Sequence, residues 1–481
     1  MSEMWLILAW VWFILTIITH LVGIASAAHA VLYARNSSAA IAWGISLVTM
    51  PWMTLPLYWV FGRHRFVGYV QALRAGLLRR SDPVVDRFLR PLEGFRSRCQ
   101  VREKAQLGYE RLARIPMTAQ NRAELLIDGQ ETYESIFEGI EKAQRYVLVF
   151  FFILRADKIG KKLQRLLIEK ANQGVPVYLM YDAMGSLFLK KSYIRELRAA
   201  GVEVVSFRSA PTREYYFQLN FRNHRKIVVT DGRAAWVGGL NLGDEHLGTN
   251  KFYGPWRDTH LKLEGPAVQG VQLVFQEDYY WASGRLLDLD WEPQPAAGGD
   301  TDALYMGSGP ADELDVGLLY FVHTINCARK RVWIASPYFV PDASVIDALK
   351  LAAMRGVDVR VIVPLRWDLY FMYLAAFSYL PECEANGIKF YRFKPGFMHQ
   401  KVMLVDDDIA CVGSSNVDNR SMRLNFEGNA VMISRAFAQR VEAMLRHDFA
   451  RSVKVEGNEY ERMRWPARLG VKLIRLLAPI L

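Results

Sequence analysis

A short pattern that occurs twice is the feature that most constrains how this chain folds. Both copies have the form His-x-Lys-x4-Asp, followed after six residues by Gly-[Gly/Ser]-x-Asn. The shared residues are His224, Lys226, Asp231 and Asn241 in the first copy, and His399, Lys401, Asp406 and Asn416 in the second. Two matches at identical spacing indicate an internal duplication, so we expect two similar halves.

The same order of helix and strand patterns precedes each copy. In the first half these are Glu131 to Ala143, Tyr146 to Leu154, 161 to 172 and Val175 to Tyr181; in the second half they are Val316 to Ala328, Arg331 to Ala335, Val345 to Met354 and Val357 to Val363. This alternation predicts an α/β fold with a largely parallel sheet. We expect two repeats, 121–295 and 296–455, packed face to face.

The spacing within each copy has a geometric meaning. A histidine and a lysine two residues apart on a strand project to the same face, so His224 and Lys226 can reach one site. An apolar strand, a turn at Asp231 and a return strand then bring Asn241 back toward them. The second copy predicts the same hairpin.

Two histidines, two lysines and two amides favour one kind of chemistry. A charged lysine cannot ligate a metal, and His-x-Lys is a poor metal pair, so we expect neither a metal nor a cofactor. Ammonium and amide groups suit a tetrahedral anion, above all a phosphate. One imidazole can attack phosphorus while a second, protonated imidazole donates to the leaving oxygen.

Two uncharged stretches near the N-terminus predict a membrane anchor. Met4 to Ala34 and Asn36 to Gly62 carry no charged side chain, and each exceeds the about 20 residues that a spanning helix needs. Residues 1–62 are therefore expected to form a two-helix transmembrane hairpin. Arginines follow the second stretch at positions 63, 65, 74, 79 and 80, whereas Arg35 stands alone between the stretches, which places the bulk of the chain on the cytoplasmic side.

The rest of the chain is basic. Residues 1–62 carry only Glu3 and Arg35, so the formal charge of +11 belongs to the remainder, which gains attraction to anionic lipids. Residues 63–120 are predicted to be a connector with interfacial character. Residues 456–481 form a basic amphipathic segment that suits either the bilayer interface or an ordinary docking helix.

Composition excludes several classes of protein. Apolar residues make up 51% and aromatic residues 12% of the chain, which argues against a disordered or low-complexity protein. The four cysteines, Cys99, Cys327, Cys383 and Cys411, form no CxxC pair. We therefore expect reduced structural thiols rather than a disulfide framework or a zinc site.

The duplicated motif resembles the defining motif of the phospholipase D superfamily. The chain more narrowly resembles the bacterial cardiolipin synthase family, and the likeness covers nearly all of it. The segments that carry the resemblance are 57–63, 223–227, 256–260 (Trp-Arg-Asp-Thr-His), 336–341 (Ser-Pro-Tyr-Phe-Val-Pro) and 420–427 (Arg-Ser-Met-Arg-Leu-Asn-Phe-Glu). The last three lie outside the general superfamily motif and point to the synthases.

This resemblance implies a metal-independent, reversible phosphatidyl transfer. Two phosphatidylglycerol molecules would give cardiolipin and glycerol through a phosphatidyl-histidine. The expected partners are phosphatidylglycerol and other anionic phospholipids of the membrane, and no nucleic acid; the oligomeric state stays open. The expected location is the bacterial inner membrane, as a multi-pass protein with its catalytic part in the cytoplasm.

The resemblance also implies roles for the site residues. His224 is assigned as the nucleophile and His399 as the general acid and base, an order that the motif alone leaves open. Lys226, Lys401, Asn241 and Asn416 would hold the phosphate oxygens, and Asp258 and Glu427 would orient the histidines. Asp231 and Asp406, although part of the catalytic motif, are expected to fix the hairpins.

Two positions depart from the commoner family text, and several functions remain open. Gln400 and Gly239 stand where a small residue and a serine are usual, so a hydroxyl donor at position 239 is missing.

The motif fits equally a hydrolase that uses water or a transferase for another head group. A nuclease would gain little from a membrane anchor, and a scaffold with a dead site would not need both motifs intact.

Overall fold

The computed structural model describes residues 2–33, 37–62, 83–98, 102–208, 220–250, 252–455 and 459–478. The arginines between positions 63 and 80, on which the expected orientation rests, lie outside the described residues, as do Arg35 and Cys99. Two compact units are present. One contains the N-terminal helices and the other an α/β body, and each is described by itself.

The N-terminal unit has one helix that is long and apolar enough to cross a membrane. It is α1 (Ser2–Tyr33), of which Glu3–Tyr33 meets the test. The second apolar stretch is not one straight span, because it forms α2 (Ser37–Thr49) and α3 (Pro51–Phe61). The break falls at Met50, where Pro51 has no N–H to continue the helix. Among the described residues of the N-terminal unit, the expected second continuous spanning helix is therefore not found.

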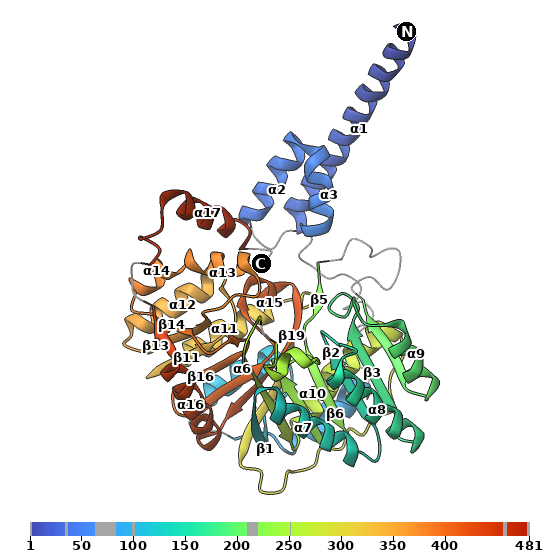
Figure 1. The fold of residues 1–481 in the computed structure, drawn as a ribbon, viewed down its shortest axis with the longest axis vertical. Coiled ribbons are helices and arrows are strands. Elements are labelled where there is room, and N and C mark those ends of the chain that lie inside the picture. The colour runs from blue at the N-terminus through green and yellow to red at the C-terminus, as the bar shows by residue number, and fades with distance from the viewer. Residues whose placement is uncertain are drawn as a thin grey trace. The chain divides into compact units, whose positions relative to one another are not determined.

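The α/β body contains two halves of similar element order, with the first in green and the second in yellow to red in Figure 1. Elements of the first half are β1 (Thr118–Ile127), α7 (Asp128–Lys142), β2 (Val147–Phe151), α8 (Lys158–Asn172), β3 (Val177–Asp182), α9 (Lys191–Ala199), β4 (Glu203–Phe207), β5 (Arg222–Asn223), β6 (Lys226–Thr230), β7 (Ala234–Gly238), the 3-10 helix η2 (Asp244–Leu247), β8 (Trp256–Arg257), β9 (Thr259–Glu264) and α10 (Val268–Ser283).

The second half repeats this order. Its elements are β10 (Thr301–Ser308), α11 (Val316–Asn326), β11 (Arg331–Ala335), β12 (Phe339–Val340), α12 (Ala343–Met354), β13 (Asp358–Pro364), α13 (Tyr370–Phe377), α14 (Leu380–Glu384), β14 (Lys389–Phe393), β15 (Phe397–Met398), β16 (Val402–Val405), β17 (Ile409–Gly413), β18 (Val417–Asp418), α15 (Asn419–Arg423), β19 (Asn425–Ile433), α16 (Arg435–Ala450) and β20 (Ser452–Lys454).

The sheet is mixed rather than largely parallel. The outer strands β2, β3 and β4, and likewise β11, β13 and β14, pair in parallel. The motif hairpins β6–β7 and β16–β17 are antiparallel, because a two-strand unit closed by a short turn cannot pair otherwise. The expectation of a mainly parallel sheet therefore holds only for its outer strands.

The two halves share one sheet path. Strand β1 pairs with β9 of the first half and with β10 of the second, and β10 continues to β19. This is an edge-to-edge connection that the expectation of face-to-face packing did not include. It joins the sheets of the two repeats rather than leaving them separate.

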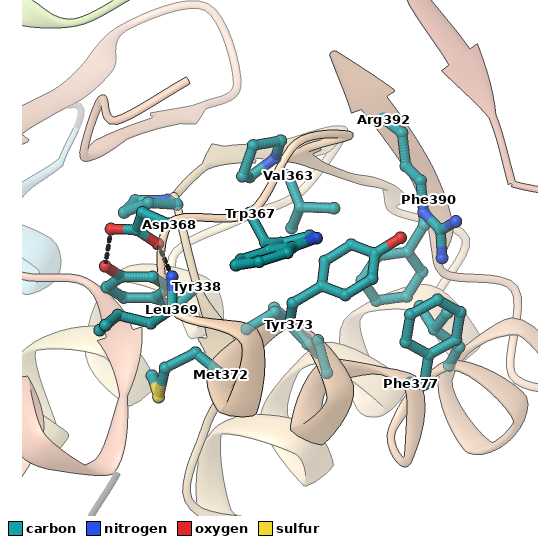
Figure 2. A pocket seen from close by; sticks show the side chains of 15 residues that line it. Tyr338, Val363, Trp367, Asp368, Leu369, Met372, Tyr373, Phe377, Phe390 and Arg392 are labelled. Carbon is teal, nitrogen blue, oxygen red and sulfur yellow. Dashed lines mark hydrogen bonds between the residues drawn. The ribbon is translucent and has the colours of Figure 1, made fainter. Parts of the chain in front are cut away.

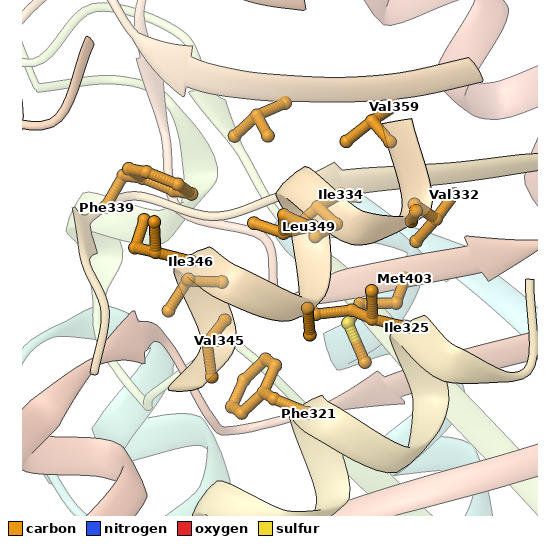
Figure 3. Close-up of a cluster of buried hydrophobic side chains, with 14 of the residues drawn as sticks. Phe321, Ile325, Val332, Ile334, Phe339, Val345, Ile346, Leu349, Val359 and Met403 are labelled. Atoms are coloured by element: carbon orange, nitrogen blue, oxygen red, sulfur yellow. The ribbon is translucent and has the colours of Figure 1, made fainter. Parts of the chain in front are cut away.

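Each half has its own hydrophobic core. Figure 3 shows part of the larger one, where α11 and α12 cover β11 and β13. The motif strands β6 and β16 are buried along their whole length, as expected for central strands whose side chains meet packed groups on both faces. This rigid setting holds the residues at their ends in fixed positions.

Part of the expected connector belongs to the core of the body. Two helices lie within it, α5 (Pro83–Glu93) and α6 (Glu103–Ala113). Tyr109 of α6 is fully buried and donates to Thr324 Oγ1 at 3.0 Å. Arg102, just before α6, binds the carboxylates of Asp406 and Asp408. These contacts tie the segment to the second repeat.

Candidate active site

The two catalytic motifs lie at the carboxyl ends of the parallel strands of their halves. Lys226 pairs with Phe151, the last residue of β2, and Val402 pairs with Ala335, the last residue of β11. Short cross-pairings join the halves at this edge: β5 pairs with β19, and β8 pairs with β15. The pairings bring residues of each half next to the histidine of the other.

His224 is held by a carboxylate of the second half. Its Nδ1 lies 3.0 Å from Glu427 Oε2 and 3.2 Å from the carbonyl oxygen of Ser414. Both partners are acceptors, so Nδ1 carries the proton. Burial opposes ionisation of Glu427, but His224 and Lys226 outweigh it and keep the pKa of Glu427 below its usual range. Nε2 is then the nitrogen free to react.

His399 is held by a carboxylate of the first half. Its Nδ1 lies 2.8 Å from Asp258 Oδ2. Burial raises the pKa of Asp258, although Lys401 opposes the rise. The pKa of His399 falls well below its usual range because of burial and then because of the charges of Lys401 and Lys226. Each histidine thus depends on the opposite repeat, a crossing that the linear sequence does not display.

The unusual Gly239 has a steric explanation. A Cβ at this position would lie 2.1 Å from Asp258 Oδ1, so only glycine leaves room for the carboxylate. The backbone N–H of Thr259 donates to the same oxygen at 2.8 Å and supplies the bond that a hydroxyl would have made. In the second half, Ser414 donates its hydroxyl to Glu427 Oε2.

Both motif lysines are buried in the site. Lys226 donates to the carbonyl of its own histidine, and Lys401 does the same and lies 3.0 Å from His399 Nδ1. Burial lowers the pKa of Lys226 to about 7 and that of Lys401 to about 8, against the opposing charges of Glu427 and Asp258. Two desolvated cations create a strong preference for a bound anion.

The two motif asparagines lie close to the site but have different partners. Asn241 Oδ1 accepts from the backbone N–H of Ile153 at 3.3 Å. The side chain of Asn416 hydrogen-bonds Asp418, while its Oδ1 is buried without a partner among the described residues. Asn416 Oδ1 is therefore the atom of the two motif amides that is buried without a hydrogen bond.

Asp231 and Asp406 lie at the far ends of the motif strands from the histidines. Asp231 accepts from the backbone N–H groups of residues 144–146 at 2.7 to 3.2 Å. Asp406 accepts in the same way from residues 329–331 and also from Arg102. Both have a left-handed backbone, with φ of 57° and 53°. These contacts fix the turns that precede the return strands.

Two buried aspartates were not anticipated from the sequence. Asp278 of α10 binds the Arg225 guanidinium at 2.6 Å through both oxygens, and Arg225 Nε donates to the carbonyl of Glu427. Asp448 of α16 binds Arg257, the neighbour of Asp258, and accepts from Gln400 Nε2 at 2.9 Å. The only available signal was an acidic residue in each of the two long helices that follow the motif segments.

The fold and the paired site define a class. Two α/β repeats, each placing His-x-Lys at one shared site, form a phospholipase D-type enzyme that transfers groups at a phosphodiester. Among the described residues, no group of three or more His, Cys, Asp or Glu side chains is placed to hold a metal ion.

Comparison with known proteins narrows this class. The family described as "Cardiolipin synthase, PLD-like domain" matches residues 136–251 and 321–449. Cardiolipin synthase A of Pseudomonas aeruginosa (strain LESB58) is 45% identical over 461 residues, 95% of this chain and 94% of that protein. The same-named protein of Pseudomonas entomophila (strain L48) is 43% identical over 467 residues, 96% of this chain and 97% of that one. The chain belongs to the cardiolipin synthase family and is a phosphatidyltransferase of the phospholipase D type.

A solved structure supports the fold. Phosphatidylserine synthase of Haemophilus influenzae Rd KW20 superposes with a TM-score of 0.59 at 16% identity, and the match covers 79% of this chain and all of that one. At this identity the likeness concerns the α/β architecture alone.

Proposed function

We propose that this protein joins two phosphatidylglycerol molecules into cardiolipin and glycerol. The observation that carries the proposal is the pair of crossed contacts, His224 with Glu427 and His399 with Asp258, beside two buried lysines. This arrangement provides two reactive imidazoles and two lysine side chains that can bind one phosphate. The two repeats act as one unit, because each supplies the carboxylate that the other's histidine needs.

In the first half-reaction, Nε2 of His224 attacks the phosphorus of one phosphatidylglycerol. The bond from phosphorus to nitrogen forms as the bond to the glycerol oxygen breaks, and protonated His399 gives its proton to that oxygen. Glu427 is the firmer anion of the two carboxylates, so it stabilises the positive charge that builds on His224. Glycerol leaves and a phosphatidyl-histidine remains.

In the second half-reaction, a hydroxyl of the second lipid's glycerol attacks the same phosphorus. His399, now neutral, takes the hydroxyl proton, and the bond from phosphorus to nitrogen breaks. One phosphodiester bond is lost and one is gained, so the transfer is reversible and needs no other reactant. Burial disfavours the charged form of both His399 and Asp258. The pair can therefore change its protonation state readily, which suits a histidine that first donates a proton and later accepts one.

The lysines and asparagines support both steps. Lys226 and Lys401 bind the non-bridging oxygens and regain full charge beside the phosphate, and Asn241 and Asn416 donate amide hydrogens to it. Donors fixed in a water-poor site stabilise the charge that accumulates in the transition state. A bound phosphate also offsets the lysine charges that depress the pKa of His399, which favours its acid form.

The proposed location is the bacterial inner membrane, with the catalytic body on the cytoplasmic side. The apolar helices α1 to α3 would hold the chain there as a multi-pass anchor, oriented by the arginines that follow position 62. This arrangement keeps the site near phosphatidylglycerol and other anionic lipids.

The direct test supplies the purified full chain in detergent with phosphatidylglycerol alone and follows the lipids by mass spectrometry. Cardiolipin and free glycerol, absent with the His399→Ala variant, would support the proposal. Phosphatidic acid without cardiolipin would instead make water the acceptor. No reaction would point to a different head group.

A further inference from the structure

The loops that follow strands β3 and β13 are equivalent in the two repeats, and both carry exposed apolar side chains. Phe188 in the first loop is 81% exposed, and Phe371, in the first turn of α13 directly after the second loop, is 62% exposed. Because both loops follow the carboxyl ends of parallel strands, they flank the edge of the sheet where the catalytic histidines lie. Water-exposed aromatic side chains at two equivalent places indicate a surface built to be covered.

The first loop reaches the site through one aromatic residue. Ser186 of the loop donates to the carbonyl of Phe152 at 3.1 Å, and the Phe152 ring lies 5.0 Å from that of His224. Phe152 therefore lies between this loop and His224.

The second loop reaches its histidine in a similar way. The ring of Trp367 lies 6.4 Å from Phe252, whose neighbour Tyr253 lies 5.8 Å from Phe397. Phe397 in turn lies 6.0 Å from His399. Each loop is thus linked to the motif histidine of its half through packed aromatic side chains.

The C-terminal helix α17 (Trp465–Arg475) extends this surface. It packs against α13, with Val471 and Ile474 turned into the core of the second half. A second stripe, Trp465, Leu469 and Leu473, stays exposed. Helix α17 is therefore a docked helix that still presents an unpaired apolar face.

We call the exposed apolar side chains of residues 184–188, of Phe252, of residues 365–371 and of α17 the apolar rim. Every exposed Phe, Trp or Tyr in the described part of the α/β body belongs to it. Behind it, a small aromatic-walled pocket continues the apolar surface inward, with Trp367 and Tyr373 side by side and Arg392 at one end (Figure 2).

Charge identifies what covers the rim. Exposed basic residues accompany three of these segments, 184–188, 365–371 and α17: Lys190, Lys191, Arg366, Arg464, Arg468 and Lys472. The single carboxylate of these segments, Asp368, accepts from the Tyr338 hydroxyl at 2.5 Å. Aromatic and aliphatic side chains bordered by cations are typical of a surface that enters the interface of an anionic bilayer.

We propose that the apolar rim inserts into an anionic phospholipid bilayer, so that lipids reach the two histidines from the membrane without passing through water. The proposal rests on the proposed function, since it assigns lipid substrates to the site. It differs from anchoring by α1, because the α/β body itself contacts the acyl chains around the mouth of the site.

The test places a polarity-sensitive fluorophore on a cysteine introduced into the full chain, as Phe188→Cys, Phe371→Cys or Leu473→Cys. Cys99→Ser removes one native thiol; burial raises the pKa of Cys327 to about 11 and those of Cys383 and Cys411 to about 12, so the others label poorly. Met354→Cys is the matched control, because Met354 is apolar and 69% exposed but lies before the amino end of β13.

Each labelled protein is reconstituted in phosphatidylglycerol vesicles that contain a phosphatidylcholine with brominated acyl chains. We expect quenching of at least about twofold at the three rim positions and little at position 354, because bromine quenches only probes that enter the acyl region. Rim probes quenched no more than the control probe would overturn the proposal.

A second measurement tests the use of the rim in catalysis. Phe371→Asp is expected to lower turnover in phosphatidylglycerol vesicles about tenfold and to leave turnover of a dissolved short-chain phosphatidylglycerol unchanged; Met354→Asp should change neither. Equal loss on both substrates would contradict the rim. Quenching needs no turnover, so quenched rim probes in a protein that makes no cardiolipin would overturn the proposed function and leave the rim standing.

Discussion

The two halves of the site carry the same motif but support it differently. In the first half, Gly239 makes room for Asp258, whose free oxygen is bound by a backbone N–H. In the second half, Ser414 donates a hydroxyl to the longer Glu427. The motif residues are therefore the same in the two halves, while the groups that support them differ.

The largest expected effect comes from removing either imidazole. His224→Ala and His399→Ala should each lower cardiolipin formation by at least about a thousandfold, because each half-reaction needs both groups. If His224 is the nucleophile, only the His399→Ala protein should accumulate a phosphatidyl adduct, visible as a mass increase on a peptide containing His224. An adduct on His399 in the His224→Ala protein would reverse the assigned roles.

Removing one carboxylate charge should cost less. Glu427→Gln and Asp258→Asn keep the shape of the side chain but weaken the hold on each Nδ1–H, and we expect kcat to fall about 100-fold or more. Glu427→Gln should be the more harmful variant if His224 bears the covalent bond. Measured rates in the opposite order would assign the larger charge development to His399.

Exchanging the supports tests whether the halves are interchangeable. Gly239→Ser places a Cβ against Asp258 and should destabilise the protein by about 1–3 kcal/mol through overpacking. Ser414→Gly removes hydroxyl bonds to Glu427 and to the N–H of Gly428, which should cost about 1 kcal/mol. Thermal unfolding would measure both, and a stabilised Gly239→Ser protein would refute the steric explanation.

The depressed lysine pKa values predict a pH effect. Between pH 7 and the ordinary lysine range, the unfolded chain binds a proton that folded Lys226 lacks, so the stability of the lipid-free protein should rise with pH in that window. Lys226→Met should flatten this rise, as seen in melting temperature at pH 7 and 9, whereas the exposed Lys158→Met should not. An unchanged slope in Lys226→Met would show that this lysine stays charged.

The smallest effect expected is that of a chelator. The proposed steps use imidazole, ammonium and amide groups, so EDTA should leave cardiolipin formation unchanged within error. Loss of activity that one added metal restores would refute the metal-free mechanism in both halves.

The reach of the sequence can be judged from particular residues. The His-x-Lys spacing predicted one strand that carries both residues, but β6 begins at Lys226 and β16 at Val402, so both histidines precede the motif strands. The turns at Asp231 and Asp406 lie where the hairpin pattern predicted them. The crossed carboxylates were out of reach, since Asp258 and Glu427 could be named as orienting residues but not matched to a histidine. That match depends on the β5–β19 and β8–β15 pairings, which involve two residues per strand.

The N-terminal stretch shows a different limit. Lack of charge predicted a second spanning helix over residues 36–62, but the backbone breaks at Met50 and Pro51. The hydropathy of this stretch favours one continuous helix, whereas Pro51 favours a break. The sequence likewise did not predict that α6 is buried against the second repeat. Arg102, just before α6, binds Asp408, which lies more than 300 positions away in the chain.

The crossed carboxylates also set an order of events during synthesis. His224 leaves the ribosome long before its partner Glu427, which follows 203 positions later, whereas the apolar N-terminal helices emerge first. A nascent chain already inserted in lipid therefore has no oriented nucleophile. If His224 is the nucleophile, chain order delays the cleavage of membrane phospholipids until the second repeat has been made.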